Sequence, residues 1–327
     1  MRTTVIGAGA WGTTLANLLA RKGEPTTLWV REAALLDEIT KTGRNTWFLP
    51  DYDLDPGLTC TTDAAQALAG ADCFLAVVPS QFLRGVLAGF KELLPDRPAI
   101  ICASKGIEMD TLKPMSEVVA EALEGLQPRY AALSGPSFAD EVSRGLPTSV
   151  TLGCSDPELG RCLRNHFSTD RFRVYTDTDF RGVELGGAVK NVVAIAAGIS
   201  DGLGFGHDAR AALITRGLAE MSRLGKAMGA RVQTFMGLSG MGDLVLTCTG
   251  DLSRNRQVGL GLGQGKTLAQ IQEGKRTVAE GVKTTQALYD LSRRLGEELP
   301  ITEQVHAILY EDKPPKQAVQ ELMGRSL

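Results

Sequence analysis

Lys190 is the residue of this sequence best placed for acid–base chemistry. It lies in the string ELGGAVKN, which spans residues 184–191 inside an otherwise apolar helical pattern. Lysine is almost never buried unless it is paired, and Gly186 and Gly187 clear one helix face near it. A lysine held near apolar groups and a second cation has a lowered pKa and suits proton transfer at a carbonyl. The alternative is a lysine whose charge reaches water from the edge of the helix.

Other residues of the second half could bind an ion or a substrate. Asp243 follows a glycine turn, so it could hold a lysine or a substrate hydroxyl, or cap a helix at 244–248. The string SRNR at 253–256 could form an anion pocket, with Arg254 bidentate to a phosphate. A solvated run of charge is the alternative for this string. Glu280, beside a glycine turn, indicates little by itself.

The first residues indicate a dinucleotide site. Residues 7–12, GAGAWG, directly follow an apolar strand at 2–6 and open a helix, which is the context in which G-x-G-x-x-G is informative. Gly7 makes the tight turn, Gly9 lets backbone N–H groups approach a pyrophosphate, and Gly12 lets helix and strand pack closely. The helix N-terminus then offers unpaired N–H groups to the phosphates.

The end of the second predicted strand, 26–30, bears on the choice of cofactor. An acidic residue there bonds the ribose 2′-hydroxyl of NAD, whereas an arginine accommodates the 2′-phosphate of NADP. Arg31 stands at that place and Glu32 is one residue late. We therefore expect NADP, or use of both cofactors, rather than strict use of NAD. The alternative for Arg31 is a solvated charge at the end of the strand.

Two loops are expected at the same edge of the sheet as the pyrophosphate turn. The string SKGIE at 104–108 places Lys105 just after a predicted strand. The string LSGPSFA at 133–139 follows another, and its Gly-Pro-Ser turn offers backbone and hydroxyl donors. Either could be an ordinary loop, but two at one edge favour a binding site.

The elements that position these residues predict two domains. Apolar strand-length runs alternate with helical patterns in the first half, which predicts a doubly wound, mostly parallel sheet of Rossmann type. The second half is expected to be all-α. We place a dinucleotide-binding domain at 1–181 and a substrate and catalytic domain at 182–327. The expected strands are 72–79, 99–102, 130–133, 149–152 and 171–175, and the expected helices are 81–94, 115–123, 183–203 and 209–228.

A glycine-rich run at 259–267 resembles a phosphate-binding loop. Leu260 stands where G-x-x-x-x-G-K-[ST] needs glycine, so we expect a flexible turn between helices there.

The bulk properties exclude several classes of partner. A net charge of −3 and 43% hydrophobic residues give no reason to expect nucleic acid or an anionic membrane. We expect no apolar run long enough to span a bilayer, and no targeting signal. The six cysteines and three histidines show no metal-ligand spacing, which predicts no metal and a reducing, cytoplasmic compartment.

The whole set of motifs resembles the bacterial-type NAD(P)-dependent glycerol-3-phosphate dehydrogenase family. The matching strings come in family order over nearly the whole chain. They are GAGAWGT from Gly7, SKGIE from Ser104, LSGPSFA from Leu133, ELGGAVKN from Glu184, AALITRGL from Ala211, SGMGDLVLTC from Ser239, SRNR from Ser253 and VAEGV from Val278.

The resemblance implies reversible hydride transfer between dihydroxyacetone phosphate and sn-glycerol 3-phosphate, for phospholipid synthesis in the cytoplasm, by a homodimer. It implies that Lys190 is the proton donor and acceptor, with Thr247 near the substrate. The substrate-binding positions that it implies are Lys105, Gly135, Ser137, Lys190, Asp243, Ser253, Arg254 and Asn255. The dinucleotide-binding positions that it implies are Ala10, Trp11, Arg31, Lys105, Ala139, Arg254, Val278 and Glu280.

One departure and two rival functions remain at this stage. The family usually has Asp-Asn where this chain has His207-Asp208, and Asp208 is expected to cap the helix there. One rival is a hydroxy-acid dehydrogenase of the 6-phosphogluconate or 3-hydroxyisobutyrate type, against which SRNR and SGPSFA argue. The other is a non-catalytic redox sensor, which needs neither a lysine facing the nicotinamide nor a second anion pocket.

Overall fold

The protein divides into two compact units. The structure, a computed structural model, describes residues 1–274 and 279–324. Unit 1 comprises Met1–Ser104, Met115–Leu133 and Ser137–Phe180, and unit 2 comprises Lys105–Pro114, Ser134–Pro136 and Arg181–Leu327. Two short loops that follow strands of unit 1 therefore belong to unit 2.

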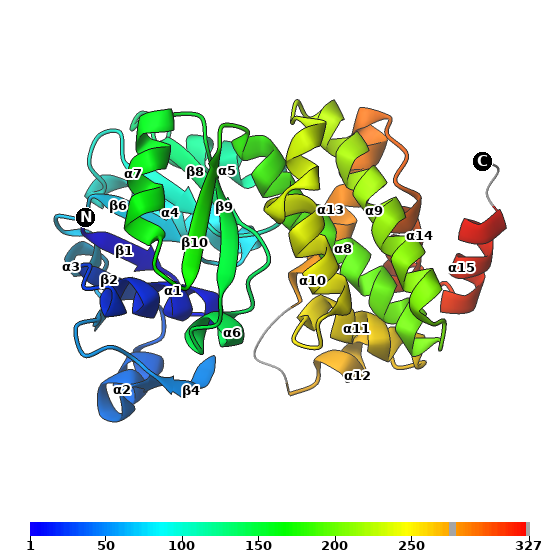
Figure 1. The fold of residues 1–327 in the computed structure, drawn as a ribbon, viewed down its shortest axis with the longest axis horizontal. Coiled ribbons are helices and arrows are strands. Elements are labelled where there is room, and N and C mark those ends of the chain that lie inside the picture. The colour runs from blue at the N-terminus through cyan, green and yellow to red at the C-terminus, as the bar shows by residue number, and fades with distance from the viewer. Residues whose placement is uncertain (275–278, 325–327) are drawn as a thin grey trace. The chain divides into compact units, whose positions relative to one another are not determined.

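Unit 1 is built on an eight-stranded sheet in the order β10-β9-β8-β7-β6-β1-β2-β5 (Figure 1). The pairs β1–β2, β1–β6, β2–β5, β6–β7, β7–β8 and β9–β10 are all parallel. The strands are β1 (Thr3–Ile6), β2 (Thr26–Trp29), β5 (Thr59–Thr61), β6 (Cys73–Ala76), β7 (Ala99–Cys102), β8 (Arg129–Ser134), β9 (Thr148–Cys154) and β10 (Phe172–Asp177). A separate antiparallel pair is formed by β3 (Arg44–Asn45) and β4 (Leu49–Asp53).

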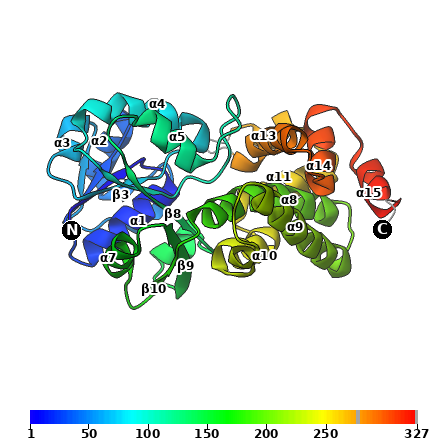
Figure 2. The same ribbon diagram turned by 90° about the horizontal axis from the view of Figure 1, so that it is seen from above.

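Helices cover both faces of this sheet. Cys73 and Leu75 of β6 pack into one core with α1 (Ala10–Arg21) and α7 (Pro157–Phe167). Phe74 and Ala76 pack into another core with α4 (Leu83–Phe90) and α5 (Met115–Ala122). Figure 2 shows α4 and α5 on one side of the strands and α1 and α7 on the other. The predicted doubly wound sheet is thus confirmed. The helices are α1 (Ala10–Arg21), α2 (Ala33–Thr42), α3 (Ala64–Leu68), α4 (Leu83–Phe90), α5 (Met115–Ala122), α6 (Ala139–Ser143) and α7 (Pro157–Phe167), with 3₁₀ turns at Ser80–Phe82 and Lys91–Leu93.

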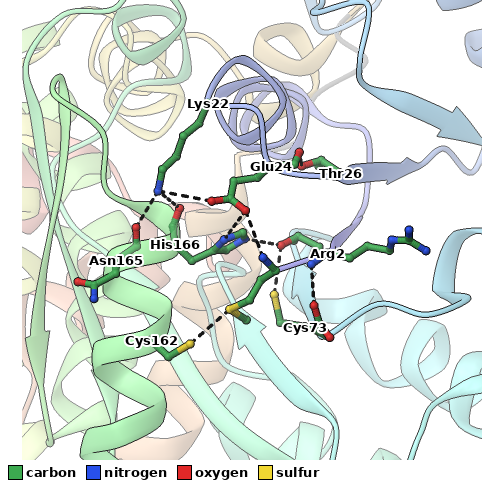
Figure 3. A network of polar contacts seen from close by, with 11 residues as sticks. Arg2, Lys22, Glu24, Thr26, Cys73, Cys162, Asn165 and His166 are labelled. Atoms are coloured by element: carbon green, nitrogen blue, oxygen red, sulfur yellow. Dashed lines mark hydrogen bonds and ion pairs between the residues drawn. The ribbon is translucent and has the colours of Figure 1, made fainter.

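A polar network fastens α7 to the amino end of β1 (Figure 3). One ring nitrogen of His166 lies 2.7 Å from Thr3 Oγ1, and the other lies 3.3 Å from Glu24 Oε2. Lys22, just after α1, donates to the carbonyl oxygen of His166 at 2.6 Å. Ligands of open parallel sheets bind at the carboxyl ends of the strands. This network lies at the amino ends of the strands, where no ligand is expected. Its role is therefore structural: it ties the sheet to α1 and α7.

Unit 2 is helical and is organised around α8 (Phe180–Gly202). By length and composition α8 could cross a membrane, so the expectation that no run is long enough was wrong. Its most apolar stretch is fully buried within the fold, as in the core helix of a water-soluble protein. The other helices are α9 (His207–Ala227), α10 (Asp243–Thr249), α11 (Arg254–Gly263), α12 (Leu268–Gln272), α13 (Glu280–Leu295), α14 (Pro300–Tyr310) and α15 (Pro315–Gly324), with a 3₁₀ segment at Val232–Met236 and a π-helical segment at Leu238–Gly242.

Helices α8 and α11 meet through glycines. A Cβ atom at Gly259 would lie 2.0 Å from the carbonyl oxygen of Ile195, and one at Gly198 would lie 2.0 Å from that of Arg256. Side chains at these positions would hold the two backbones apart. Gly202 and Gly263 make the same kind of contact. The prediction of an interhelical turn at 259–267 was therefore wrong for residues 259–263, which belong to α11. Gly259 and Gly263 allow close packing against α8.

The start of α9 also differs from expectation. Its N-cap is Gly206, without a side-chain hydrogen bond, and Asp208 lies in the first helical turn. The expectation that Asp208 caps the helix was wrong because the helix begins two residues earlier than expected, at His207.

Candidate active site

Two lysines of unit 2 share one buried carboxylate. Lys190 on α8 donates from Nζ to Asp243 Oδ1, and also to Thr247 Oγ1 at 2.9 Å. Lys105 Nζ lies 2.8 Å from the other carboxylate oxygen, Oδ2. The side chain of Asp243 is 1% exposed and that of Lys190 is 8% exposed. The four polar groups therefore form one cluster that is largely withdrawn from water.

The paired glycines of α8 explain how this cluster forms. A Cβ atom at Gly186 would lie 2.5 Å from the carbonyl oxygen of Ser239, in the segment that leads into α10 and Asp243. A Cβ atom at Gly187 would lie 2.8 Å from Ser134 Oγ and 3.4 Å from Cγ of Lys105. The glycine face of α8 thus admits the backbone before Asp243 and the stem of Lys105. Asp243 and Lys105 can therefore both approach Lys190.

Burial sets the electrostatics of the cluster. It lowers the pKa of Lys190 to about 7, with a further contribution from the charge of Lys105, while Asp243 opposes the shift. Burial alone would raise the pKa of Asp243, but Lys105 and Lys190 hold that pKa below its usual value. Asp243 is therefore ionised at neutral pH, and Lys190 can give or take a proton there.

The N-terminus of α11 carries the predicted anion-binding residues. Ser253 is the N-cap, and its side chain accepts from the backbone N–H of Arg256 at 3.2 Å. Arg254, the first helical residue, is exposed. Within the residues that the structure describes, Arg254 has no ion pair. An exposed guanidinium at a helix N-terminus suits a phosphate.

Asn255 is held differently from Arg254. Its Nδ2 donates to Asn191 Oδ1 at 2.9 Å, and its Oδ1 accepts from the N–H of Gly281 at 2.9 Å. The side chain of Asn255 therefore links α8, α11 and α13. Asn191 was not predicted as a site residue, although its place beside Lys190 was a signal. Ser134 was not predicted either; its Oγ is buried and has no hydrogen-bond partner among the described residues.

The glycine turn of unit 1 fits a dinucleotide. Gly7 has φ of +115°, and a Cβ atom at Gly12 would lie 1.9 Å from the carbonyl oxygen of Gly7. Gly9, the N-cap of α1, has no atom within 4 Å of where its Cβ would stand. The indole N–H of Trp11 is buried and has no partner in the described part of the chain. The turn therefore offers open space and unpaired donors at the start of a helix.

The remaining predicted positions lie as follows. Arg31 follows β2 with its side chain 68% exposed, and its Nε donates to Glu32 Oε1 at 2.8 Å. Ala139 begins α6, and its carbonyl oxygen accepts from Thr14 Oγ1 on α1 at 3.4 Å. Ala10 begins α1, Gly135 (φ +149°) follows β8 within unit 2, Ser137 lies in unit 1, and Glu280 begins α13. Val278 lies outside the described residues.

The structure thus brings Lys105, Lys190, Asp243 and Thr247 into direct contact. No group of three or more His, Cys, Asp or Glu side chains that could hold a metal occurs among residues 1–274 and 279–324. The cluster has the parts of a proton-transfer site: a buried amine with its pKa near neutrality, a fixed counter-charge and an orienting hydroxyl.

Comparisons with known proteins give one consistent family. The model described as NAD-dependent glycerol-3-phosphate dehydrogenase N-terminus matches residues 2–160, and the one described as the C-terminus of the same enzyme matches residues 179–320. A glycerol-3-phosphate dehydrogenase [NAD(P)+] of Maridesulfovibrio salexigens is 65% identical over 327 residues, covering 100% of this chain and 99% of that protein. The protein of that name from Geobacter sulfurreducens is 57% identical, with 100% and 98% covered.

A solved structure agrees with these sequence relatives. The crystal structure of glycerol-3-phosphate dehydrogenase from Coxiella burnetii superposes with a TM-score of 0.95 at 44% identity, covering 99% of each chain. These relatives support neither the hydroxy-acid dehydrogenase nor the redox sensor. The chain belongs to the NAD-dependent glycerol-3-phosphate dehydrogenase family.

Proposed function

We propose that this protein is an NAD(P)-dependent oxidoreductase that interconverts dihydroxyacetone phosphate and sn-glycerol 3-phosphate. The observation that carries the proposal is the buried Lys190 on Asp243, with a pKa of about 7. An amine of that pKa can protonate the oxygen of a carbonyl as it is reduced, and can accept the proton in the reverse reaction. When bound, the nicotinamide supplies or accepts the hydride.

Each residue of the cluster then has a separate role. Lys190 gives its proton to the alkoxide oxygen that develops in reduction. Asp243 and Thr247 hold the Lys190 amine through the contacts at Oδ1 and Oγ1. Lys105 adds positive potential where negative charge develops, and Asp243 fixes its position.

The substrate phosphate is proposed to bind at the N-terminus of α11. Arg254 supplies an exposed guanidinium there, and Ser253 and Asn255 set the first turn. Binding energy from the phosphate orients the carbonyl for reaction. We carry Gly135 and Ser137 forward as further substrate-binding residues, on the family resemblance alone.

Residues 1–181 are proposed to bind the dinucleotide and residues 182–327 to bind the substrate. The first assignment is supported by the open turn at Gly9 and the unpaired indole of Trp11. Ala139, Val278 and Glu280 join the cofactor set on the resemblance. NADPH is the favoured cofactor, because the exposed Arg31 at the end of β2 suits a 2′-phosphate.

We further propose a cytoplasmic homodimer whose product feeds phospholipid synthesis. The six cysteines are free, which suits a reducing compartment. Large apolar side chains are exposed along one segment of unit 2, at Val232, Met236, Met241 and Val245, which suits a protein contact. Light scattering of the purified protein tests the homodimer, and fractionation of the source cells tests the cytoplasmic location.

The reaction is tested by following oxidation of NADPH, and in parallel of NADH, with dihydroxyacetone phosphate. Consumption with product glycerol 3-phosphate supports the proposal, and the ratio of the two rates reports on the adenosine pocket. Binding of NADPH with consumption of neither NADPH nor NADH overturns it. A panel containing 3-hydroxyisobutyrate and 6-phosphogluconate in the oxidative direction separates the hydroxy-acid alternative.

A further inference from the structure

The second arginine of the SRNR string is tied into an ion cluster in which Asp201 and Arg256 are largely buried and Asp251 is exposed. Arg256 Nε and Nη2 lie 2.9 and 2.8 Å from Asp201 Oδ2, and its Nη1 lies 2.9 Å from Asp251 Oδ1. The other oxygen of Asp201 accepts from Nε of Arg210 at 2.9 Å. The side chains of Asp201 and Arg256 are 8% and 11% exposed. The charges in this cluster balance, so Arg256 is not an additional anion ligand.

The cluster joins two helices whose placement matters for the reaction. Asp201 lies near the C-terminal end of α8, the same unbroken helix that carries Lys190. Arg256 lies in the first turn of α11, two residues after Arg254, and its own N–H is the one that Ser253 caps. The carbonyl oxygen of Arg256 stands where Gly198 of α8 lacks a side chain. Arg256 therefore holds the start of α11 against α8 by its side chain and its backbone.

We infer that Asp201 and Arg256 are positioning residues for the substrate phosphate. The ion pair fixes the rotation of the first turn of α11, and with it the direction of the Arg254 side chain and of the first free N–H groups. Loss of the pair lets this turn shift while α8 and Lys190 stay in place. The inference rests on the proposed function, since it assigns a task to the α11 terminus only if a phosphorylated substrate binds there.

A substitution in the pair is expected to weaken phosphate recognition and, with it, the orientation of the carbonyl. We expect Asp201→Asn and Arg256→Lys to lower kcat/KM for dihydroxyacetone phosphate about 10-fold or more, with a raised KM. With dihydroxyacetone, which has no phosphate, kcat/KM of both variants should match that of the parent protein. Arg294→Lys, at an exposed site on α13, is the matched control.

The outcomes are distinct. Equal losses with dihydroxyacetone phosphate and dihydroxyacetone would show a merely structural role and overturn the inference. An unchanged KM in a folded variant would overturn it as well. If Asp201→Asn does not fold, the inference is tested with Arg256→Lys alone, which keeps the positive charge and loses the guanidinium contacts to Asp201. Failure of the proposed function is recognised separately, because the parent protein would then turn over neither substrate.

Discussion

Lys105 and Lys190 donate to different oxygens of one buried carboxylate, that of Asp243. Burial lowers the pKa of Lys190 to about 7, and the charge of Lys105 contributes to that shift. The charge of Lys105 thus lowers the pKa of Lys190, and the charge of Asp243 opposes that change. Substitutions at Lys105 and Asp243 should therefore shift the pH dependence of activity in predictable directions, besides lowering activity.

Replacement of Lys190 by alanine should lower kcat by about 10²–10⁴-fold, the usual contribution of a general acid or base. NADPH binding, followed by fluorescence titration, should be retained, because the dinucleotide turn belongs to unit 1. Lys266→Ala, which removes an exposed lysine of unit 2, is the control. Near-normal turnover by Lys190→Ala would refute its catalytic assignment.

The two directions of the reaction should show opposite pH dependence. Reduction needs protonated Lys190, so its kcat/KM should fall as pH rises through about 7, whereas oxidation needs the neutral amine and should rise. Lys105→Met removes a charge that lowers the pKa of Lys190 and should move the midpoint to higher pH. Asp243→Asn removes a charge that raises it and should move the midpoint to lower pH. Shifts of the same sign would contradict this account.

Arg31→Gln should lower kcat/KM for NADPH about 10–100-fold and change that for NADH little, because it removes the contact to the 2′-phosphate that we propose for Arg31. Glu32→Gln frees Arg31 from its ion pair and should shift the preference further toward NADPH. Steady-state kinetics with both cofactors at saturating substrate give the ratio. Equal losses of kcat/KM with NADPH and NADH would show that Arg31 does not bind the 2′-phosphate.

Glu220 should make stability depend on pH. This buried residue of α9 accepts from the N–H of Ile301 at 2.6 Å, at the start of α14, which has no side-chain cap of its own. Burial raises the pKa of Glu220 from 4.5 to about 7. Its contribution to stability is therefore complete below pH 4.5 and is lost as pH rises through about 7. The thermal midpoint of the parent protein minus that of Glu220→Gln should fall over this interval, and a rise would contradict the assignment.

Gly259→Ala should destabilise unit 2 by about 1–3 kcal/mol or more, because the new Cβ meets backbone that cannot move aside. The contact is the 2.0 Å approach to the carbonyl oxygen of Ile195. Gly85→Ala in α4 is the matched control, since no atom lies within 4 Å of its Cβ position. That variant should be neutral or more stable by about 0.5–1 kcal/mol. Thermal denaturation of both variants decides, and equal midpoints would exclude tight packing at Gly259.

The sequence predicted what rests on local pattern. The buried central strands appear as continuous apolar runs, and the charge of Lys190 is conspicuous within an apolar helix. The short strands β3, β4 and β5 were not predicted, because two to five partly exposed residues carry no periodicity. The glycines of α11 resembled a loop, since only the approach of α8 explains them. The side-chain partners of Asn255 and Arg256 likewise depend on helix packing that no local pattern encodes.

The apolar composition of α8 has a consequence for biosynthesis. Its side chains form the centre of a core completed by residues as late as Leu299, Ile301 and Val305. The ribosome therefore releases α8 before the last helices that cover it have been made. Until α14 emerges, part of the apolar surface of α8 lacks its cover, and such exposed surface favours aggregation. A nonsense mutation before α14 would thus yield a chain that aggregates, with little inactive but folded enzyme.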